Sequence, residues 1–380
     1  MWLILAWLAI GLTLCYCALI FSYYGWFTRL RLFKPQPSEP LTRFSIIIPA
    51  RNEEANIEKC VISILKNDYP SNLYEVIVAD DFSTDNTALI IKNLQQQYSN
   101  LKLIHLSHIV ANKLNSYKKK SIETAIAQSS YEWIITTDAD CDVNTQWLSL
   151  FDAYIQKNNP VFVAAPVKFV DGGSFISIFQ CLDFMSLQGI TAASVSAGFH
   201  AMCNGANLAY KKEAFYAVNG FKDVDNIASG DDMLLMHKIQ KQYSRKIGYL
   251  FSRNAIVSTL PMHSLKSFLN QRIRWASKAT SYTDKKIFLV LLLVYLFNLI
   301  LFLLPLLSII EPSLLFYWIR LLVIKTFCEL VFMLPVARFF GEQKLLWYFP
   351  VMQPFHIVYT VVSGWLGKFG KYEWKGRTVK

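Results

Sequence analysis

The sequence predicts an α/β protein with a doubly wound, mostly parallel sheet, to which helical transmembrane segments are added. Between residues 44 and 137, short apolar runs alternate with stretches of helical periodicity, as in sheets covered by helices. Long uncharged stretches lie near both ends. Of the 380 residues, 53% are hydrophobic and only 17% are charged, whereas soluble domains average about 45–50% apolar and about 25% charged residues. Part of the chain is therefore expected in lipid.

Composition and charge exclude several classes of protein. The apolar content excludes a disordered or collagen-like chain and a small disulfide-stapled module. The seven cysteines form no CxxC pair, which favours reduced thiols over a zinc site. The net charge of +11 comes mainly from basic residues beside the apolar runs. Because they form no patch interleaved with aromatic residues, binding of nucleic acid is not favoured.

The first apolar run, residues 2–24, is long enough to cross a hydrocarbon core. It has no basic region before it and no small-residue cleavage site, so it is interpreted as a retained anchor rather than a signal peptide. Residues 287–310 form a second uncharged span.

Two further apolar runs are less regular. The third, residues 314–337, contains Arg320, Lys325 and Glu329. Lys325 and Glu329 are four residues apart and can pair on one helix face, which lowers their cost in lipid. The fourth run, residues 345–366, is broken by two prolines and is interpreted as re-entrant or interfacial.

Basic residues beside a span mark its cytoplasmic side. They follow the first span and precede the second at Arg29, Arg31, Lys34, Arg43, Lys278, Lys285 and Lys286. The region between these spans is therefore predicted to face the cytosol, with the N-terminus outside. The tail is also basic, at Lys368, Lys371, Lys375, Arg377 and Lys380. Four complete spans would place this tail outside, which is why the fourth run is not counted as a full span.

Four strands are predicted in the region between the first two spans, at residues 44–49, 75–79, 101–106 and 133–137, with helices at 53–66, 84–97 and 118–128. In doubly wound sheets, ligands bind at the carboxyl ends of the strands. Polar residues gather there at Arg51, Asn52, Glu53, Asp80, Asp81, Asp138 and Asp140. No GxGxxG and no P-loop pattern is present, so a bound nucleotide is expected to meet carboxylates through a divalent cation.

Each polar motif has a structural reading and a functional one. Asp138 and Asp140 suit one hard cation, but also a turn. Asp80 and Asp81 suit a nucleoside, but aspartates often simply end a strand. Asp232 precedes a helical stretch, where it suits a general base or an N-cap.

The basic motifs are equally open. Residues 118–120 are three lysines, which suit a diphosphate or a solvated helix start. Residues 271–275, Gln-Arg-Ile-Arg-Trp, suit an amphipathic interfacial helix. They also offer arginine for phosphate and tryptophan for the apolar face of a sugar.

Taken together, the motifs resemble glycosyltransferase family 2, in its membrane-anchored branch. The resemblance covers residues 44–280 and rests on Ile48–Glu53, Val78–Asp85, Thr137–Asp140, Asn204–Asn207, Gly230–Asp232 and Gln271–Trp275. It implies a GT-A fold, a nucleotide-diphosphate sugar donor and inversion at the anomeric carbon. Two features depart from the family: Gly-Asp-Asp stands where Glu-Asp is common, and the spans are fewer than in membrane polysaccharide synthases.

The resemblance also implies residue roles. Asp232 matches the catalytic base, and Asp138 and Asp140 the pair that holds Mg²⁺ or Mn²⁺. The residues implied in binding the donor nucleotide and diphosphate are Pro49, Arg51, Glu53, Asp80, Asp81, Lys119 or a neighbour in its run, Asp138, Gln271 and Arg274. Those implied on the acceptor side are Asn204, Gly205, Asp231 and Trp275.

The expected organisation is an anchor over residues 1–28, a cytosolic GT-A catalytic domain over 29–262, an amphipathic interfacial helix over 263–286, transmembrane or re-entrant helices over 287–366 and a basic tail over 367–380. The expected activity is metal-dependent transfer of a hexosyl or N-acetylhexosaminyl group, from a UDP-sugar to a lipid or lipid-linked hydroxyl. The alternatives are a β-glycan synthase that works with an export partner or as an oligomer, a non-catalytic membrane scaffold and a transporter.

Overall fold

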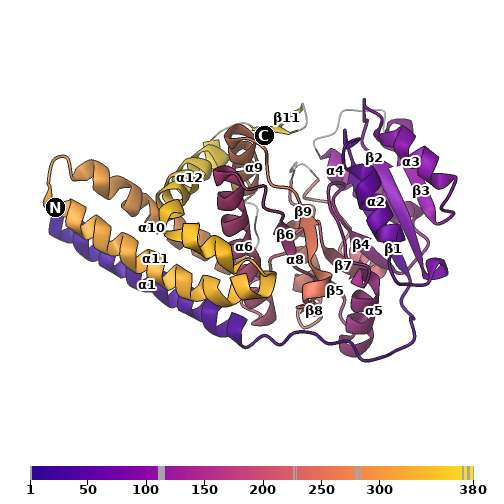
Figure 1. The fold of residues 1–380 in the computed structure, drawn as a ribbon, viewed down its shortest axis with the longest axis horizontal. Helices are drawn as coiled ribbons and strands as arrows, with labels where there is room; N and C mark the ends of the chain where they lie inside the picture. Colours follow the sequence, from indigo (N-terminus) through magenta and orange to yellow (C-terminus); the bar gives the residue numbers. More distant parts are fainter. Residues whose placement is uncertain are drawn as a thin grey trace. The chain divides into compact units, whose positions relative to one another are not determined.

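The computed structural model describes residues 2–109, 116–225, 227, 229–278, 282, 284–369, 372–374 and 377–379. The chain forms two compact units (Figure 1). The helical unit comprises Met1–Leu30, Asp171–His200 and Pro261–Tyr372, and the sheet unit comprises Arg31–Val170, Ala201–Leu260 and Glu373–Lys380. Residues 171–200, which the sequence places within the catalytic domain, thus cluster with the apolar helices. The basic tail residues Lys371, Lys375 and Lys380 lie outside the described residues.

The sheet unit is built on one seven-stranded sheet with the order β3-β2-β1-β4-β7-β5-β8. Its strands are β1 (Phe44–Ala50), β2 (Tyr74–Asp80), β3 (Leu101–His105), β4 (Trp133–Thr136), β5 (Phe162–Ala164), β7 (Leu208–Lys211) and β8 (Ile247–Tyr249). Strands β1 to β4 are mutually parallel, and β7 runs antiparallel to both of its neighbours. The predicted mostly parallel sheet is confirmed.

The helices of the sheet unit are α2 (Ile57–Leu65), α3 (Thr87–Gln95), α4 (Tyr117–Gln128), α5 (Trp147–Asn158), α7 (Lys212–Ala217) and α8 (Met233–Gln242), with short turns η1 (Ser71–Leu73), η2 (Leu106–His108) and η3 (Arg253–Ala255). A second, two-stranded sheet pairs β6 (Val167–Phe169) with β9 (Val257–Thr259). The four predicted strands and three predicted helices are all present.

Strand β1 shows why this sheet forms its core. Ile46, Ile47 and Ile48 are all fully buried, which requires cover on both faces of the sheet. The register pairs Ala50 with Asp80, so β1 and β2 end side by side. The loops that leave the two strands therefore start from neighbouring points, and these are the loops that carry the predicted site residues.

The helical unit consists of α1 (Trp2–Thr28), α6 (Phe175–Ser196), α9 (Leu265–Ala276), α10 (Lys285–Leu307), α11 (Ser313–Phe340), the turn η5 (Gln343–Tyr348) and α12 (Phe349–Phe369). Within this unit α1, α10 and α11 lie alongside one another (Figure 1). A short pair, β10 (Tyr372–Trp374) and β11 (Arg377–Val379), follows α12.

Among the described residues, four helical segments are long and apolar enough to cross a membrane: Leu5–Thr28, Phe175–Ser196, Lys285–Leu307 and Gln343–Phe369. Three of them match predicted runs. The second, α6, was not expected, and 72% of its apolar window is buried inside the unit. The third predicted span corresponds to the long helix α11. This helix is not among the four apolar segments because it carries too many charged side chains.

The charges of α11 are paired within the helical unit. Lys325 Nζ lies 2.8 Å from Glu329 Oε1, which confirms the predicted pair. Lys325 also donates to Gln353 Oε1 at 2.6 Å, and Gln353 Nε2 donates to Glu329 Oε2 at 2.6 Å. The hydroxyl of Tyr16 donates to Glu329. The network joins α1, α11 and α12 and supplies each buried charge with a partner, as a low-dielectric interior requires.

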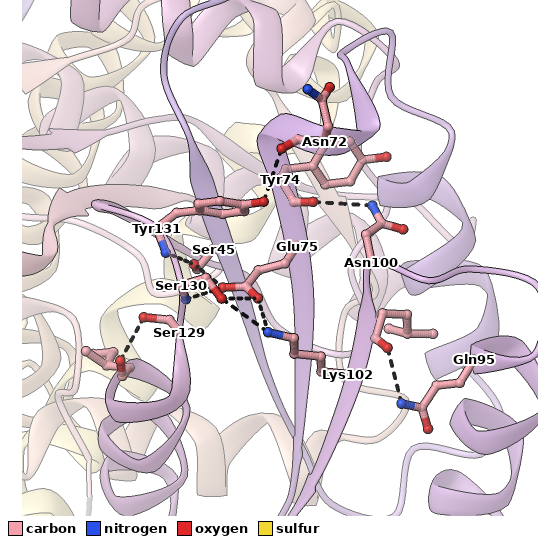
Figure 2. Close-up of polar contacts among 12 residues, drawn as sticks. Ser45, Asn72, Tyr74, Glu75, Gln95, Asn100, Lys102, Ser129, Ser130 and Tyr131 are labelled. Carbon is pink, nitrogen blue, oxygen red and sulfur yellow. Dashed lines mark hydrogen bonds and ion pairs between the residues drawn. The ribbon is translucent and has the colours of Figure 1, made fainter.

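A second network, centred on the buried carboxylate of Glu75, lies in the sheet unit at the amino end of β2 (Figure 2). The carboxylate of Glu75 accepts hydrogen bonds from Ser45 Oγ at 2.6 Å and from Lys102 Nζ at 2.5 Å. The backbone N–H of Ser130 also donates to it. Burial alone would raise the pKa of Glu75, but the hydrogen bonds from Lys102, Ser130 and Ser45 outweigh it and lower the pKa. Three strands and the start of β4 are thereby tied to one anion.

We expect Glu75→Gln to lower the free energy of unfolding by about 1–3 kcal/mol at pH 7. Ser45, Lys102 and Ser130 are placed to donate hydrogen bonds to a carboxylate, and the amide removes its charge and one of its acceptor oxygens. A carboxyl whose pKa is lowered in the folded state contributes stability above its unfolded pKa of about 4.3 and loses that contribution as pH falls further. The difference in thermal midpoint between wild type and variant should therefore shrink below about pH 4. Glu123→Gln, at a solvent-exposed pair with Lys120, is the control and should change little. A Glu75→Gln variant as stable as wild type at pH 7 would contradict this.

Candidate active site

The loops after β1 and β2 are tied together by Arg51. Its Nη1 donates to the carbonyl oxygens of Asp81 at 2.8 Å and Phe82 at 3.1 Å. Asn52 and Phe82 both adopt left-handed backbone conformations, with φ of 50° and 53°, which residues other than glycine adopt only under local constraint. Arg51 supplies that constraint, since it fixes the carbonyls on either side of the turn at Phe82.

Side chains reinforce the same pair of loops. The N–H of Asn52 donates to Ser83 Oγ at 3.0 Å, and the N–H of Thr84 donates back to Asn52 Oδ1 at 2.8 Å. The N–H of Glu53 donates to Thr87 Oγ1 at 2.8 Å, at the start of α3. The Glu53 carboxylate is left beside the sheet edge, where it accepts a hydrogen bond from Asn56 Nδ2 at 3.2 Å.

Asp80 is buried at the end of β2. Its Oδ1 accepts from the N–H of Ser83 at 3.2 Å, and its Oδ2 lies 3.3 Å from His105 Nδ1. The His105 ring in turn lies 5.0 Å from that of His108. His105 was missed from the sequence, although it ends β3 and the same strand-end rule that selects Asp80 would have found it. Asp80, Asp81 and His105 therefore form one polar group at the carboxyl edge of β2 and β3.

Asp138 and Asp140 follow β4 at the same edge of the sheet. Burial, the largest cause, and the neighbouring carboxylates of Asp138 and Glu53 together raise the pKa of Asp140 to about 6, against a lowering by the hydrogen bond from Thr259. Carboxylates crowded in this way are stabilised by a cation. Among the described residues, no three His, Cys, Asp or Glu side chains converge as a complete metal site. Two carboxylates with open positions fit a divalent ion whose other ligands come from phosphate and water.

Lys118 connects the aspartates of two distant motifs. Its Nζ lies 2.8 Å from Asp138 Oδ1 and 3.2 Å from Asp231 Oδ2. Burial would lower the pKa of Lys118, but Asp138 and Asp231 outweigh it and raise the pKa. The ammonium of Lys119, named from the sequence, donates instead to the carbonyls of Val224 and Ile227 at 2.6 Å each. The lysine of this run that meets the acidic residues is therefore Lys118.

Asp232 caps helix α8. Its Oδ1 accepts from the N–H of Met233 at 2.7 Å, and its Oδ2 accepts from the N–H of Gly205 at 3.1 Å. A Cβ atom at Gly205 would lie 3.2 Å from Asp231 Oδ2 and 3.6 Å from Lys118 Nζ. The absence of a side chain at this glycine therefore lets the backbone come close to the acidic group. The structure brings Asp138, Asp231, Asp232 and Gly205 together around Lys118.

The other predicted residues are accounted for as follows. Pro49 lies in β1, where it pairs with Ala79. The Oδ1 of Asn204 accepts from the N–H of Ala206 at 2.9 Å, which shapes the turn before Gly205. Gln271, Arg274 and Trp275 lie on α9 in the helical unit; this helix spans only Leu265–Ala276 of the predicted 263–286. The family resemblance implies donor roles for Gln271 and Arg274 and an acceptor role for Trp275.

The chain matches two known protein-family patterns. The pattern of glycosyl transferase family 2 matches residues 45–217. That of glycosyl transferase family group 2 matches residues 133–366, which is more than half of the chain. The chain belongs to the family 2 glycosyltransferases. The family assignment made from the motifs is thereby confirmed.

Three curated relatives match different shares of the chain. The chain is 33% identical over 146 residues to glycosyltransferase AglE of Haloferax volcanii, covering 38% of this chain and 46% of that protein. It is 27% identical over 255 residues to a poly-beta-1,6-N-acetyl-D-glucosamine synthase of Staphylococcus epidermidis, covering 66% and 57%. It is 30% identical over 151 residues to the beta-monoglucosyldiacylglycerol synthase of Synechocystis, covering 37% and 30%. The chain matches about half the length of the first two relatives.

The fold of this family 2 enzyme is shared with a solved structure. The mannosyltransferase PcManGT of Pyrobaculum calidifontis, in complex with GDP-mannose and Mn²⁺, superposes with a TM-score of 0.60 over 93% of this chain and 99% of that one. The two sequences are 19% identical. This likeness supports the GT-A fold.

We expect Lys118→Met to lower the rate of nucleoside diphosphate release at least tenfold, because Asp138 and Asp231 lose the cation between them. The thermal midpoint should fall as well, and MnCl₂ should restore more of it in the variant than in wild type, since a divalent ion supplies the missing charge. Lys120→Met removes an exposed lysine of the same run and is the matched control. Equal rates for Lys118→Met and Lys120→Met would refute this role.

Proposed function

We propose that this protein is an inverting glycosyltransferase that moves a sugar from a nucleoside diphosphate donor, a UDP-sugar, to a hydroxyl of a lipid or lipid-linked acceptor at the membrane surface. The observation that carries the proposal is the gathering of Asp138, Asp231 and Asp232 around Lys118. This group supplies both a candidate base, Asp232, and a candidate cation-binding carboxylate, Asp138.

The donor's diphosphate gains negative charge as the sugar leaves it. A Mg²⁺ or Mn²⁺ ion held by Asp138 and Asp140 would offset that charge without a proton donor. Lys118 contributes a fixed positive charge beside Asp138. Gln271 and Arg274 are proposed to bind the same diphosphate, as the family resemblance implies. The roles of these residues are to bind the leaving group and to hold it in line with the acceptor.

Asp232 is proposed as the base. Two backbone N–H groups, from Met233 and Gly205, hold its carboxylate in one orientation. A carboxylate fixed in this way can take the proton of the acceptor hydroxyl as the hydroxyl oxygen attacks the anomeric carbon. One displacement, with one base opposite the leaving group, inverts the configuration of that carbon. Asp231 and Asn204 lie beside Asp232 and Gly205 along the chain and are proposed to meet the acceptor.

The nucleoside is proposed to lie along the edge of β1, β2 and β3. Asp80 and Asp81 offer carboxylates to base N–H and ribose hydroxyl groups. Glu53, Pro49 near the end of β1 and the turn at Phe82 held by Arg51 are proposed to form the neighbouring wall. His105, hydrogen-bonded to Asp80, extends this polar edge beyond the residues named from the sequence.

The names of two relatives give two kinds of product, a glucosyldiacylglycerol and a polysaccharide. We favour transfer of a single sugar to a lipid. In the helical unit the space between α1, α11 and α12 is filled by Lys325, Glu329, Gln353 and Tyr16, which bond to one another. A polymer would therefore need a route outside this part of the unit, such as a partner protein. The match of a polysaccharide synthase to 66% of the chain favours the second candidate function, which is polymer synthesis.

The proposed orientation places the sheet unit in the cytosol. The end of α12 supports this topology from within the helical unit. A Cβ atom at Gly367 would come within 2.7 Å of Ala276 Cβ, so this end of α12 packs against the end of α9. The chain enters α10 shortly after α9, from the side where Lys278, Lys285 and Lys286 lie. We therefore propose that α12 returns to the cytosolic side, together with the basic tail.

We expect Asp232→Asn to reduce sugar transfer by at least a factor of 10³ and to leave donor affinity within about twofold, because the base is needed only as the proton leaves. Transfer from labelled UDP-glucose and UDP-N-acetylglucosamine into a total lipid extract measures the first quantity. Binding of the labelled donor measures the second. Asp225→Asn is an exposed control on the same chain segment and should retain activity. Full transfer by Asp232→Asn would exclude Asp232 as the base.

We expect the labelled product to carry a single added sugar. The polar side chains between α1, α11 and α12 bond to one another, so they are not available to line a path for a polymer. Thin-layer chromatography of the lipid product, followed by mass spectrometry, resolves one addition from many. A ladder of lengths would identify the protein as a polymer synthase instead.

A further inference from the structure

Helix α9 is fastened to α6 by a buried ion pair. Arg272 Nη2 lies 2.6 Å from Asp183 Oδ2, and the exposed fractions of the two side chains are 3% and 2%. Asp183 also accepts a hydrogen bond from the hydroxyl of Tyr359 on α12. His356, from the same helix, lies 4.0 Å from this carboxylate. Three helices of the helical unit thus meet at Asp183.

The other contacts of Arg272 are with residues of its own helix. Its guanidinium carbon lies 4.1 Å from the centre of the Trp275 ring and 4.9 Å from that of Phe268. Its Nη1 donates to Gln271 Oε1 at 3.4 Å. The Trp275 ring also approaches Phe184 of α6, at 6.0 Å between centroids. One arginine therefore touches both Gln271, which is proposed to bind the diphosphate, and Trp275, which the family resemblance places on the acceptor side.

This arrangement does more than fasten a helix. A buried ion pair is a poor source of stability, because a well-packed apolar pair of similar volume usually serves as well or better. What the pair provides is geometry: Asp183 fixes the guanidinium plane, and a fixed planar cation holds an aromatic ring against its face. A lysine could keep the charge beside Asp183 but could not keep a planar cation against the Trp275 ring.

We propose that Arg272 is a positioning residue that, held by Asp183, fixes the orientation of the Trp275 indole and thereby the acceptor. The second half of this statement rests on the proposed function. The first half concerns contacts inside the helical unit alone and can be tested independently of any activity.

The orientation of the indole is tested by ¹⁹F NMR on the full chain in detergent, with 5-fluorotryptophan at its ten tryptophans. Loss of one resonance in Trp275→Phe assigns Trp275. Arg272→Lys and Asp183→Asn should each shift or broaden that resonance and leave the other nine in place. Glu329→Gln is the matched control, since it removes a buried charge of the same unit that touches neither α6 nor α9 in these contacts. A Trp275 resonance that stays unmoved in both variants overturns the proposal, and Asp183→Asn decides should Arg272→Lys fail to fold.

The consequence for the acceptor is tested by a double-mutant cycle. Arg272→Lys should lower the acceptor kcat/KM, measured with a total lipid extract in vesicles, roughly tenfold, equivalent to about 1.4 kcal/mol. Hydrolysis of the donor by water should change less than twofold. In a Trp275→Leu background the same substitution should add less than twofold, because its effect passes through the missing ring. Additive losses, or equal losses in transfer and hydrolysis, would contradict positioning through Trp275. If the wild-type protein releases no nucleoside diphosphate, the proposed function is refuted. The NMR measurement then still tests whether Arg272 orients the Trp275 indole.

Discussion

The candidate site depends on the two ion pairs that the ammonium of Lys118 forms with Asp138 and Asp231. Asp138, at the end of β4, and Asp231, just before α8, come from distant parts of the chain and carry the same charge. Carboxylates brought together in a partly buried place repel each other, and the repulsion falls most on the group with least access to water. Asp140 shows that strain in its raised pKa. Lys118 relieves it between Asp138 and Asp231, and the missing side chain of Gly205 leaves the space for it to do so.

Much of this arrangement could be predicted because the rule behind it is topological. Parallel strands end at one edge, so apolar runs followed by polar residues place Glu53, Asp80 and Asp138 near each other without any knowledge of contacts. The choice between Lys118 and Lys119 could not be made in the same way. Three consecutive lysines on a helix point in three directions, and the rotation of α4 is set by which of its apolar residues pack against β1 and β2. In α4 that rotation sends Lys119 to backbone carbonyls and Lys118 to the aspartates.

Helix α6 escaped prediction as an apolar span for a related reason. It carries Gln180, Asp183 and Gln188, which lower its hydropathy, yet all three are buried by neighbouring helices. A helix that is surrounded by protein can hold polar residues that a helix facing lipid cannot. The partner of Asp183 could not be predicted either. Arg272 lies within the Gln271–Trp275 motif, but it is not one of the motif residues to which the family resemblance gives a role. Their contact joins residues far apart in the sequence, and no local pattern announces it.

The paired charges of α11 bear on how the protein reaches its folded state in the membrane. Each isolated lysine or glutamate at the centre of a helix adds about 2.5–3.5 kcal/mol to the cost of inserting it into lipid. Helix α11 carries both, and the hydroxyl that completes their network belongs to α1, which is made first. The network can therefore be completed only after both helices have been synthesised. Biogenesis of this protein is thus a long-range event, in which the N-terminal helix acts as an acceptor for a segment synthesised more than three hundred residues later.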